Sequence, residues 1–284
     1  MLNVLFITLL MVGTAGQSIA QKNYNAKFKG QGTIFFLSVS ALSACLFFLV
    51  TSGFKLSFSI ALLPYTFAYA VCYAFAAVMG FMAIRTGPLS LTSLIIAYSL
   101  IIPTFYGLIF LGDKVGVFFW IGFVLLSGSL FLINSPAANT KITLKWIVFV
   151  LLAFLGNGFC ALIQTKQQRD FDGALGNEMM IFALFIAAVL VFAVALISDR
   201  KSIPELAKRG THFMVMCGVS NGLANFMLIL LLPRMLSAVL FPVISAGQII
   251  TSWVVSRFIY KEKLSVKQNV ALVLGTAAIV FMNL

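Results

Sequence analysis

The chain has 284 residues, of which 62% are hydrophobic and 9% are charged, and its mean hydropathy is +1.09. Because soluble proteins carry about 25% charged residues, this composition excludes an ordinary soluble domain. The net charge of +12 would suggest a nucleic-acid partner in a soluble protein. Here the basic residues fall in short breaks between apolar runs, where they face anionic lipid headgroups. We therefore expect a lipid bilayer around the chain and no nucleic-acid partner.

Ten apolar segments follow one another along the chain, and each is long enough to cross a bilayer. In the first half they cover residues 2–20, 32–51, 64–84, 89–110 and 117–133. In the second half they cover residues 144–164, 179–197, 213–232, 236–258 and 266–284. The sequence predicts an all-α integral membrane protein with ten transmembrane helices, multi-pass in the cell membrane.

The first apolar segment also has features of a secretory signal peptide, because Ser18-Ile19-Ala20 could serve as a small-residue cleavage site. No positive residue precedes the apolar run, however, and its removal would leave nine helices. The polar sequence at residues 17–22 also resembles the sequence at residues 164–169 in the second half. We expect this helix to be retained.

A sequence repeat divides the chain into halves. Residues 111–134 align with residues 260–283, an offset of 149, with five identical positions and an acidic residue followed by lysine in each copy, Asp113-Lys114 and Glu262-Lys263. A repeat of about half the chain length is typical of membrane transporters. We predict a first five-helix repeat at residues 1–134, a linker at 135–143 and a second five-helix repeat at 144–284.

The distribution of basic residues predicts the orientation of the chain in the membrane. The loops after the odd-numbered helices, with their flanking helix ends, hold 14 of the 19 Lys and Arg residues, and the even-numbered loops hold five. Since basic loops stay in the cytoplasm, the odd loops are expected inside and both termini outside.

Polar side chains within the spans are the candidates for a binding site, because a bilayer tolerates them only when they face a cavity or a partner helix. The seven acidic residues all fall in loops or at a helix edge, so the predicted span centres offer neutral groups only. Amides and tyrosines suit a neutral or zwitterionic ligand with a planar part. Helix-to-helix hydrogen bonding without a ligand is the alternative reading of each amide.

The sequence contains few residues or motifs that would support a cofactor site or an enzyme active site. The cysteines at 45, 72, 160 and 217 lie inside apolar spans without CxxC spacing or histidine neighbours, so neither a metal site nor a disulfide is expected. The spans carry no HExxH, no GxSxG and no paired aspartates, and the chain has no P-loop. We predict no catalytic residues, no metal and no cofactor.

The ten-helix pattern, with an acidic turn before the fifth and tenth helices, resembles the drug/metabolite transporter superfamily and its EamA-type branch. The family's glycine–glutamate turn is Gly112-Asp113 in one copy and Lys261-Glu262 in the other. The resemblance implies two inverted five-helix repeats around a central cavity lined mainly by helices 1, 3, 4, 6, 8 and 9. It also implies cytoplasmic termini, which disagrees with the distribution of basic residues.

On these six helices, the candidate substrate-binding residues are Gln17, Tyr69, Tyr73, Tyr98, Asn157, Gln164, Asn221, Asn225, Ser245 and Gln248. Pro103 and Pro242 lie within the fourth and ninth helices, where each removes a backbone hydrogen bond and could serve as a hinge.

We expect a secondary or facilitated transporter that moves a small nucleobase- or amino-acid-like metabolite by alternating access, as a monomer or homodimer. Two alternatives stay open. One is a multidrug exporter that holds organic cations against tyrosine rings by cation–π contact, although the intramembrane glutamate of small related exporters is missing here. The other is a lipid flippase.

Overall fold

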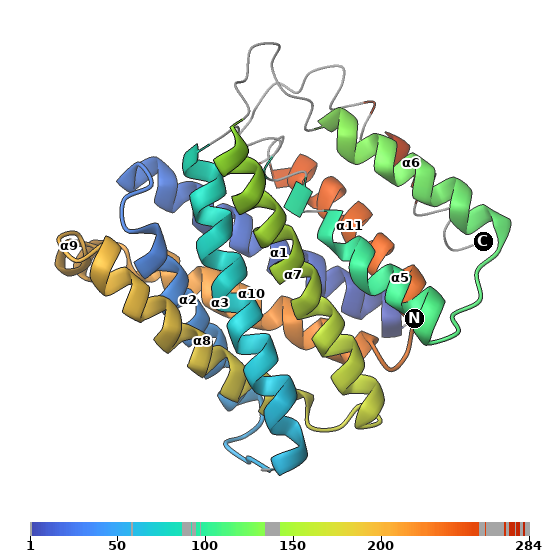
Figure 1. The fold of residues 1–284 in the computed structure, drawn as a ribbon, viewed down its shortest axis with the longest axis horizontal. Coiled ribbons are helices and arrows are strands. Elements are labelled where there is room, and N and C mark those ends of the chain that lie inside the picture. Colours follow the sequence, from blue (N-terminus) through green and yellow to red (C-terminus); the bar gives the residue numbers. More distant parts are fainter. Residues whose placement is uncertain are drawn as a thin grey trace.

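The computed structural model describes residues 2–57, 59–86, 98–133 and 143–255, together with residues 92, 95, 96, 259, 270, 273–275, 277, 278 and 281. These residues form a bundle of helices, and no strand occurs among them (Figure 1). The elements of the first half are α1 (Leu2–Phe28), α2 (Thr33–Thr51), η1 (Ile60–Leu62), α3 (Leu63–Thr86), η2 (Tyr98–Leu100), α5 (Ile101–Phe110) and α6 (Val117–Ile133). The elements of the second half are α7 (Leu144–Asp170), α8 (Gly176–Ser198), α9 (Ile203–Arg209), α10 (Thr211–Leu231) and α11 (Ser237–Val254).

Six of these helices are long and apolar enough to cross a membrane: α1, α2, α3 with η1, α7, α8 and α10. Shorter apolar helices lie at Tyr98–Phe110, Val117–Ser129 and Ser237–Gln248. The chain is thus a multi-pass membrane protein whose described elements are all helical. The predicted segments at 89–110 and 266–284 are described only in part, and Glu262, Lys263 and linker residues 135–142 lie outside the described residues.

The predicted end of the first helix is eight residues too early. The helix continues to Phe28, because its polar last part still has one face that packs on the bundle. Tyr24 is 1% exposed, and its hydroxyl donates hydrogen bonds to the carbonyl oxygens of Gln31 and Gly32. The basic side chains Lys22 and Lys27 lie on the exposed surface of this last part.

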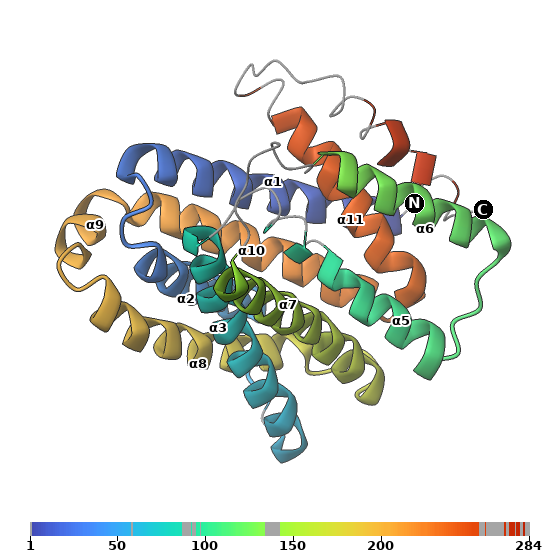
Figure 2. The ribbon, with the colours of Figure 1, turned by 45° about the horizontal axis from the view of Figure 1, so that its top comes forward.

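The core of the bundle consists of antiparallel helix pairs in which each partner comes from a different half of the chain. α1 packs on α10, α3 on α7, and α2 on α8, while α2 also packs alongside α10. Figures 1 and 2 show these helices crossing at the centre. Small residues at the contacts allow the backbones of paired helices to approach closely. At Gly218 in α10, a Cβ atom would lie 2.2 Å from the carbonyl oxygen of Ser40 in α2.

The edge of the bundle is formed by α6 and the described C-terminal residues (Figure 1). Phe119 and Leu126 of α6 form a buried cluster with Ala238 and Ala246 of α11 and Ala278. Phe118 also contacts Phe281, with ring centroids 6.2 Å apart. Described residues of the two repeated segments, Ala278 and Phe281 from the second and Phe118, Phe119 and Leu126 from the first, therefore meet at one side, away from the crossing centre.

Replacing Gly218 with alanine should destabilise the fold by about 1–3 kcal/mol, because the new methyl group overlaps backbone of α2 that cannot move independently. The thermal unfolding temperature in detergent would measure the loss. Gly80→Ala is the matched control, since its Cβ would meet only ordinary contacts, 3.6 Å from Ile96 Cδ1 and 3.9 Å from Ala153 Cβ. Equal unfolding temperatures for the two variants would contradict this account of the packing.

Candidate functional site: a central polar cavity

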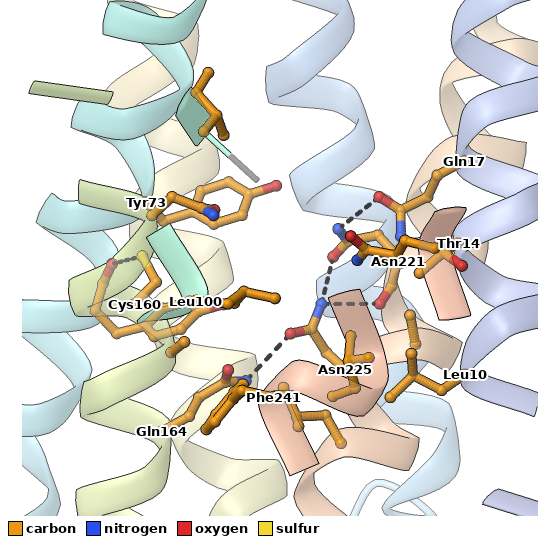
Figure 3. A pocket seen from close by; sticks show the side chains of 18 residues that line it. Leu10, Thr14, Gln17, Tyr73, Leu100, Cys160, Gln164, Asn221, Asn225 and Phe241 are labelled. Atoms are coloured by element: carbon orange, nitrogen blue, oxygen red, sulfur yellow. Dashed lines mark hydrogen bonds between the residues drawn. The ribbon is translucent and has the colours of Figure 1, made fainter. Parts of the chain in front are cut away.

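A cavity of about 470 Å³ lies between α1, α3, α7, α10, α11 and the η2 turn (Figure 3). We call it the central cavity. Its polar lining consists of Thr14, Gln17, Tyr69, Tyr73, Asn157, Cys160, Gln164, Asn221, Asn225 and Gln248. Its apolar lining consists of Leu10, Ile96, Leu100, Ala161, Ala224, Leu228, Phe241 and Ile244. No charged residue of the described chain lines it.

Four amide side chains form one hydrogen-bonded chain along the wall of this cavity. Gln164 Nε2 donates to Asn225 Oδ1 at 3.2 Å, Asn225 Nδ2 donates to Asn221 Oδ1 at 3.0 Å, and Asn221 Nδ2 donates to Gln17 Oε1 at 3.2 Å. Figure 3 shows this chain running from α7 across α10 to α1. Each of the four amides therefore has at least one hydrogen-bond partner within the chain, as polar groups in a membrane interior require.

Two tyrosines one turn apart on α3 form an aromatic wall opposite the amide chain. The rings of Tyr69 and Tyr73 are stacked, with centroids 6.1 Å apart and an interplanar angle of 20°. Tyr69 is 3% exposed, whereas Tyr73 is only half-buried and points into the cavity (Figure 3). A planar ligand could lie against such a surface.

Asn157 adds a fixed polar group beside the tyrosines. Its Nδ2 donates to Ser99 Oγ of the η2 turn at 2.6 Å, while its Oδ1 accepts no hydrogen bond from the described residues. The residue thus links α7 to η2 and lines the cavity.

The structure brings eight of the ten predicted residues together in the central cavity: Gln17, Tyr69, Tyr73, Asn157, Gln164, Asn221, Asn225 and Gln248. Tyr98 and Ser245 lie elsewhere and line a much smaller cavity with Pro242. The Tyr98 hydroxyl donates to the carbonyl oxygen of Ser127 at 2.6 Å, and the Ser245 hydroxyl donates to that of Phe241 within its own helix. Both hydroxyls are therefore occupied outside the central cavity.

The candidate set did not include Thr14 and Cys160, which also line the cavity. Thr14 lies three positions before Gln17, and this spacing places both side chains on the same face of a helix. The sequence therefore contains enough information to include Thr14 among the candidates. Cys160 carried no such signal, because a thiol in an apolar helix usually acts as a small apolar residue. Pro103 is buried in α5 and Pro242 lies inside α11, and their hinge role stays a prediction.

The two ends of the central cavity differ in character. At one end, Leu10, Phe241 and Ile244 belong to a fully apolar buried cluster that continues through Leu231 and Leu240. Toward the other end, a neighbouring space of about 330 Å³ shares Thr14, Gln17 and Gln248 with the cavity and continues along Ser18, Gln21 and Thr251. We call these the apolar end and the polar end.

A buried carboxylate joins the halves beyond the apolar end. Asp113, whose side chain is 2% exposed, accepts a hydrogen bond from the backbone N–H of Ala238 at 3.0 Å. Its other oxygen lies 3.8 Å from Arg169 Nη2. We call this group the Asp113 clamp; it connects the α5–α6 loop to the start of α11 and the end of α7.

Comparison with known proteins agrees with this architecture. The sequence profile of the EamA-like transporter family matches residues 144–284. The second half of the chain belongs to the EamA-like transporter family. This match indicates a membrane transporter of the drug/metabolite type.

Solved structures support the same fold, and 28 chains match. One of them, a protein of known crystal structure, superposes with a TM-score of 0.78 over 98% of this chain and 95% of its own, at 11% sequence identity. At this identity the likeness concerns the fold alone. A comparison with curated protein sequences gave no match.

The amide chain of this EamA-like protein can be tested by a double-mutant cycle. Gln17→Ala and Asn221→Ala should be coupled by about 0.6 kcal/mol in unfolding free energy, the average for hydrogen bonds between membrane helices. The reason is that each variant alone already breaks their shared bond. Thr8→Val is the control partner for Asn221→Ala, because the exposed Thr8 bonds only to Val4 within α1. Strict additivity of Gln17→Ala and Asn221→Ala would contradict the bond.

Proposed function

We propose that the chain is a secondary or facilitated transporter that moves a small neutral or zwitterionic metabolite, nucleobase- or amino-acid-like, through the central cavity. The observation that carries the proposal is the amide chain facing a stacked tyrosine pair in a cavity without charged lining residues in the described chain. Amides offer donors and acceptors side by side, as the edge of a nucleobase or a carboxamide does.

The volume and the charge of the cavity both favour such a ligand. A space of about 470 Å³ is within the range of small-molecule sites. A ligand with a net charge would lose its hydration without meeting an opposite charge among the described lining residues, which is costly in a low-dielectric interior. A zwitterion loses less, since its own charges lie close together.

Organic-cation export is a second candidate, and the tyrosine pair supports it. A quaternary amine could lie over the Tyr73 ring by cation–π contact. This mode would make no use of the four amides, and therefore it explains less of the site.

The packing of the helices supports the proposal of two inverted five-helix repeats. If α1 is exchanged with α7, α2 with α8, α3 with α10, and α5 with α11, the principal contacts map onto one another. The α1–α10 pair becomes α7–α3, the α2–α10 pair becomes α8–α3, and the α1–α11 pair becomes α7–α5. The match of the EamA-like profile starts at residue 144, where the second repeat is predicted to begin.

In this proposal, alternating access requires the apolar end of the central cavity to open while its polar end closes. The start of α11 depends on Asp113, because the N–H of Ala238 lies in the first helical turn and has no partner within the helix. The Ala238 carbonyl also lacks its usual helical donor, since the residue four positions later is Pro242. Release of the Asp113 clamp would therefore free this helix end to move about Pro242.

A ligand screen tests the proposed substrate class. Thermal shift of detergent-purified protein with nucleobases, zwitterionic amino acids and quaternary amines should give stabilisation by a nucleobase or an amino acid. Gln164→Ala or Asn221→Ala should weaken that ligand roughly 2- to 13-fold, the effect of one lost hydrogen bond of about 0.5–1.5 kcal/mol. Thr8→Val should leave it unchanged. Stabilisation by quaternary amines alone, reduced by Tyr73→Ala and not by the amide variants, would favour the cation candidate instead.

The Asp113 clamp gives a separate prediction. In a protein freed of its four native cysteines, Leu240→Cys lies buried in the apolar end and should react slowly with a small aqueous thiol reagent. Adding Asp113→Ala should raise the labelling rate several-fold. The substitution removes the hydrogen bond between Ala238 and the carboxylate, and such a bond contributes about 1.5–3 kcal/mol to holding this end closed. Glu205→Gln, at the far end of the bundle, is the control. A rate no faster than that control would argue against the clamp.

Orientation is part of the same proposal: the odd loops lie in the cytoplasm and both termini lie outside. Single cysteines at Lys55 and at Lys208, in a cysteine-free background, would report the side of the membrane. In intact cells, an impermeant thiol reagent should label Lys55→Cys and spare Lys208→Cys. The opposite pattern would place the termini in the cytoplasm.

A further inference from the structure

A second large cavity is lined mainly by residues around the α1–α2 and α8–α9 junctions. These two junctions lie at the same end of the bundle (Figure 2). We call it the basic cavity. Its volume is about 1040 Å³, and none of its lining residues lines the central cavity. Its charged lining consists of Lys29, Arg200, Lys201, Asp199 and Glu205.

Each of the two acidic side chains of the basic cavity interacts with a group outside the lining cations. Asp199 Oδ2 accepts a hydrogen bond at 2.9 Å from the backbone N–H of Phe35, near the start of α2. Glu205 Oε1 lies 3.4 Å from Arg209 Nη1, one turn further along α9. Among the described residues, neither carboxylate forms an ion pair with a basic group of the cavity lining, which holds three basic residues against two acidic ones.

The three basic side chains of this lining have no such partners in the described chain. Lys29, Arg200 and Lys201 are exposed, and none forms an ion pair or a side-chain hydrogen bond in the part of the chain that the structure describes. The amides of Asn25 and Gln31 add donors to the same wall. Cations grouped around a concave space attract an anion, and a guanidinium with ammonium groups suits a phosphate group.

The surface next to the basic cavity favours a lipid over a soluble phosphate. Ile197, which lines the cavity, is 87% exposed. Exposed apolar side chains continue from it along α8, at Phe185, Val189, Phe192 and Leu196. A ligand that carries a phosphate at one end and hydrocarbon chains at the other would match both surfaces at once.

We propose that the basic cavity binds the phosphate headgroup of an anionic phospholipid, with its acyl chains against the exposed apolar side of α8. The site is separate from the transported substrate and does not depend on its identity. It lies among the odd loops, which the charge distribution assigns to the cytoplasm, the side where anionic lipids are concentrated.

The proposal can be tested on purified protein in a mild detergent by adding dioleoylphosphatidylglycerol and following the unfolding temperature. This lipid should raise the unfolding temperature saturably, and dioleoylphosphatidylcholine should do so much less. The double variant Arg200→Gln, Lys201→Gln should bind phosphatidylglycerol roughly tenfold more weakly, since each basic residue near a lipid surface contributes measurably. The control Lys55→Gln, Lys114→Gln removes the same charge from even loops and should bind as the parent protein does.

Three results would overturn the proposal. Equal stabilisation by the two lipids would show that no anion is recognised. Equal affinities in the double variant and its control would place the lipid elsewhere. Stabilisation by soluble glycerol phosphate to the same extent as by the lipid would show a site for a free phosphate. Because the substituted side chains are exposed, the lipid-free unfolding temperatures of both variants should match that of the parent protein.

Discussion

The hydrogen-bonded chain from Gln164 to Gln17 is the interaction on which the rest of the structure depends. It lets three helices from the two halves share one polar cavity in a membrane interior, where unpaired polar groups are costly. Each bond contributes only about 0.6 kcal/mol between membrane helices. A ligand that offers the same donors and acceptors can therefore replace these bonds at little cost. In the proposed function, the same amides stabilise the helix contacts and also bind the metabolite.

The apolar end of the cavity depends on a different kind of interaction. Leu10, Leu240 and Phe241 exclude water by packing, and the Asp113 clamp holds the start of α11 over them. In the proposed transport cycle, one hydrogen bond to a carboxylate is strong enough to hold this end closed and weak enough to be broken when it opens. The basic cavity lies at the opposite end of the bundle, so a lipid bound there would not obstruct the Asp113 clamp.

The sequence was informative about which residues are polar within the spans, and less so about which neighbours they face. Long apolar runs predicted most helices, because a bilayer requires such runs. Tyr98 and Ser245 were misplaced because helical periodicity defines a face but not the helix that the face meets. Tyr98 begins a 3-10 turn and its hydroxyl reaches Ser127 on α6. The extension of α1 to Phe28 was missed because Tyr24 is buried by contacts that only the folded bundle provides.

The most direct test of the account is an exchange experiment in proteoliposomes. A radiolabelled ligand identified by thermal shift should enter saturably, and preloading the vesicles with unlabelled ligand should accelerate its uptake, because a loaded cavity returns through the same conformational cycle. The Gln164→Ala, Asn221→Ala double variant should need a higher ligand concentration for half-maximal uptake. Uptake that is linear with concentration, insensitive to preloading and unchanged in the double variant would contradict a single alternating cavity.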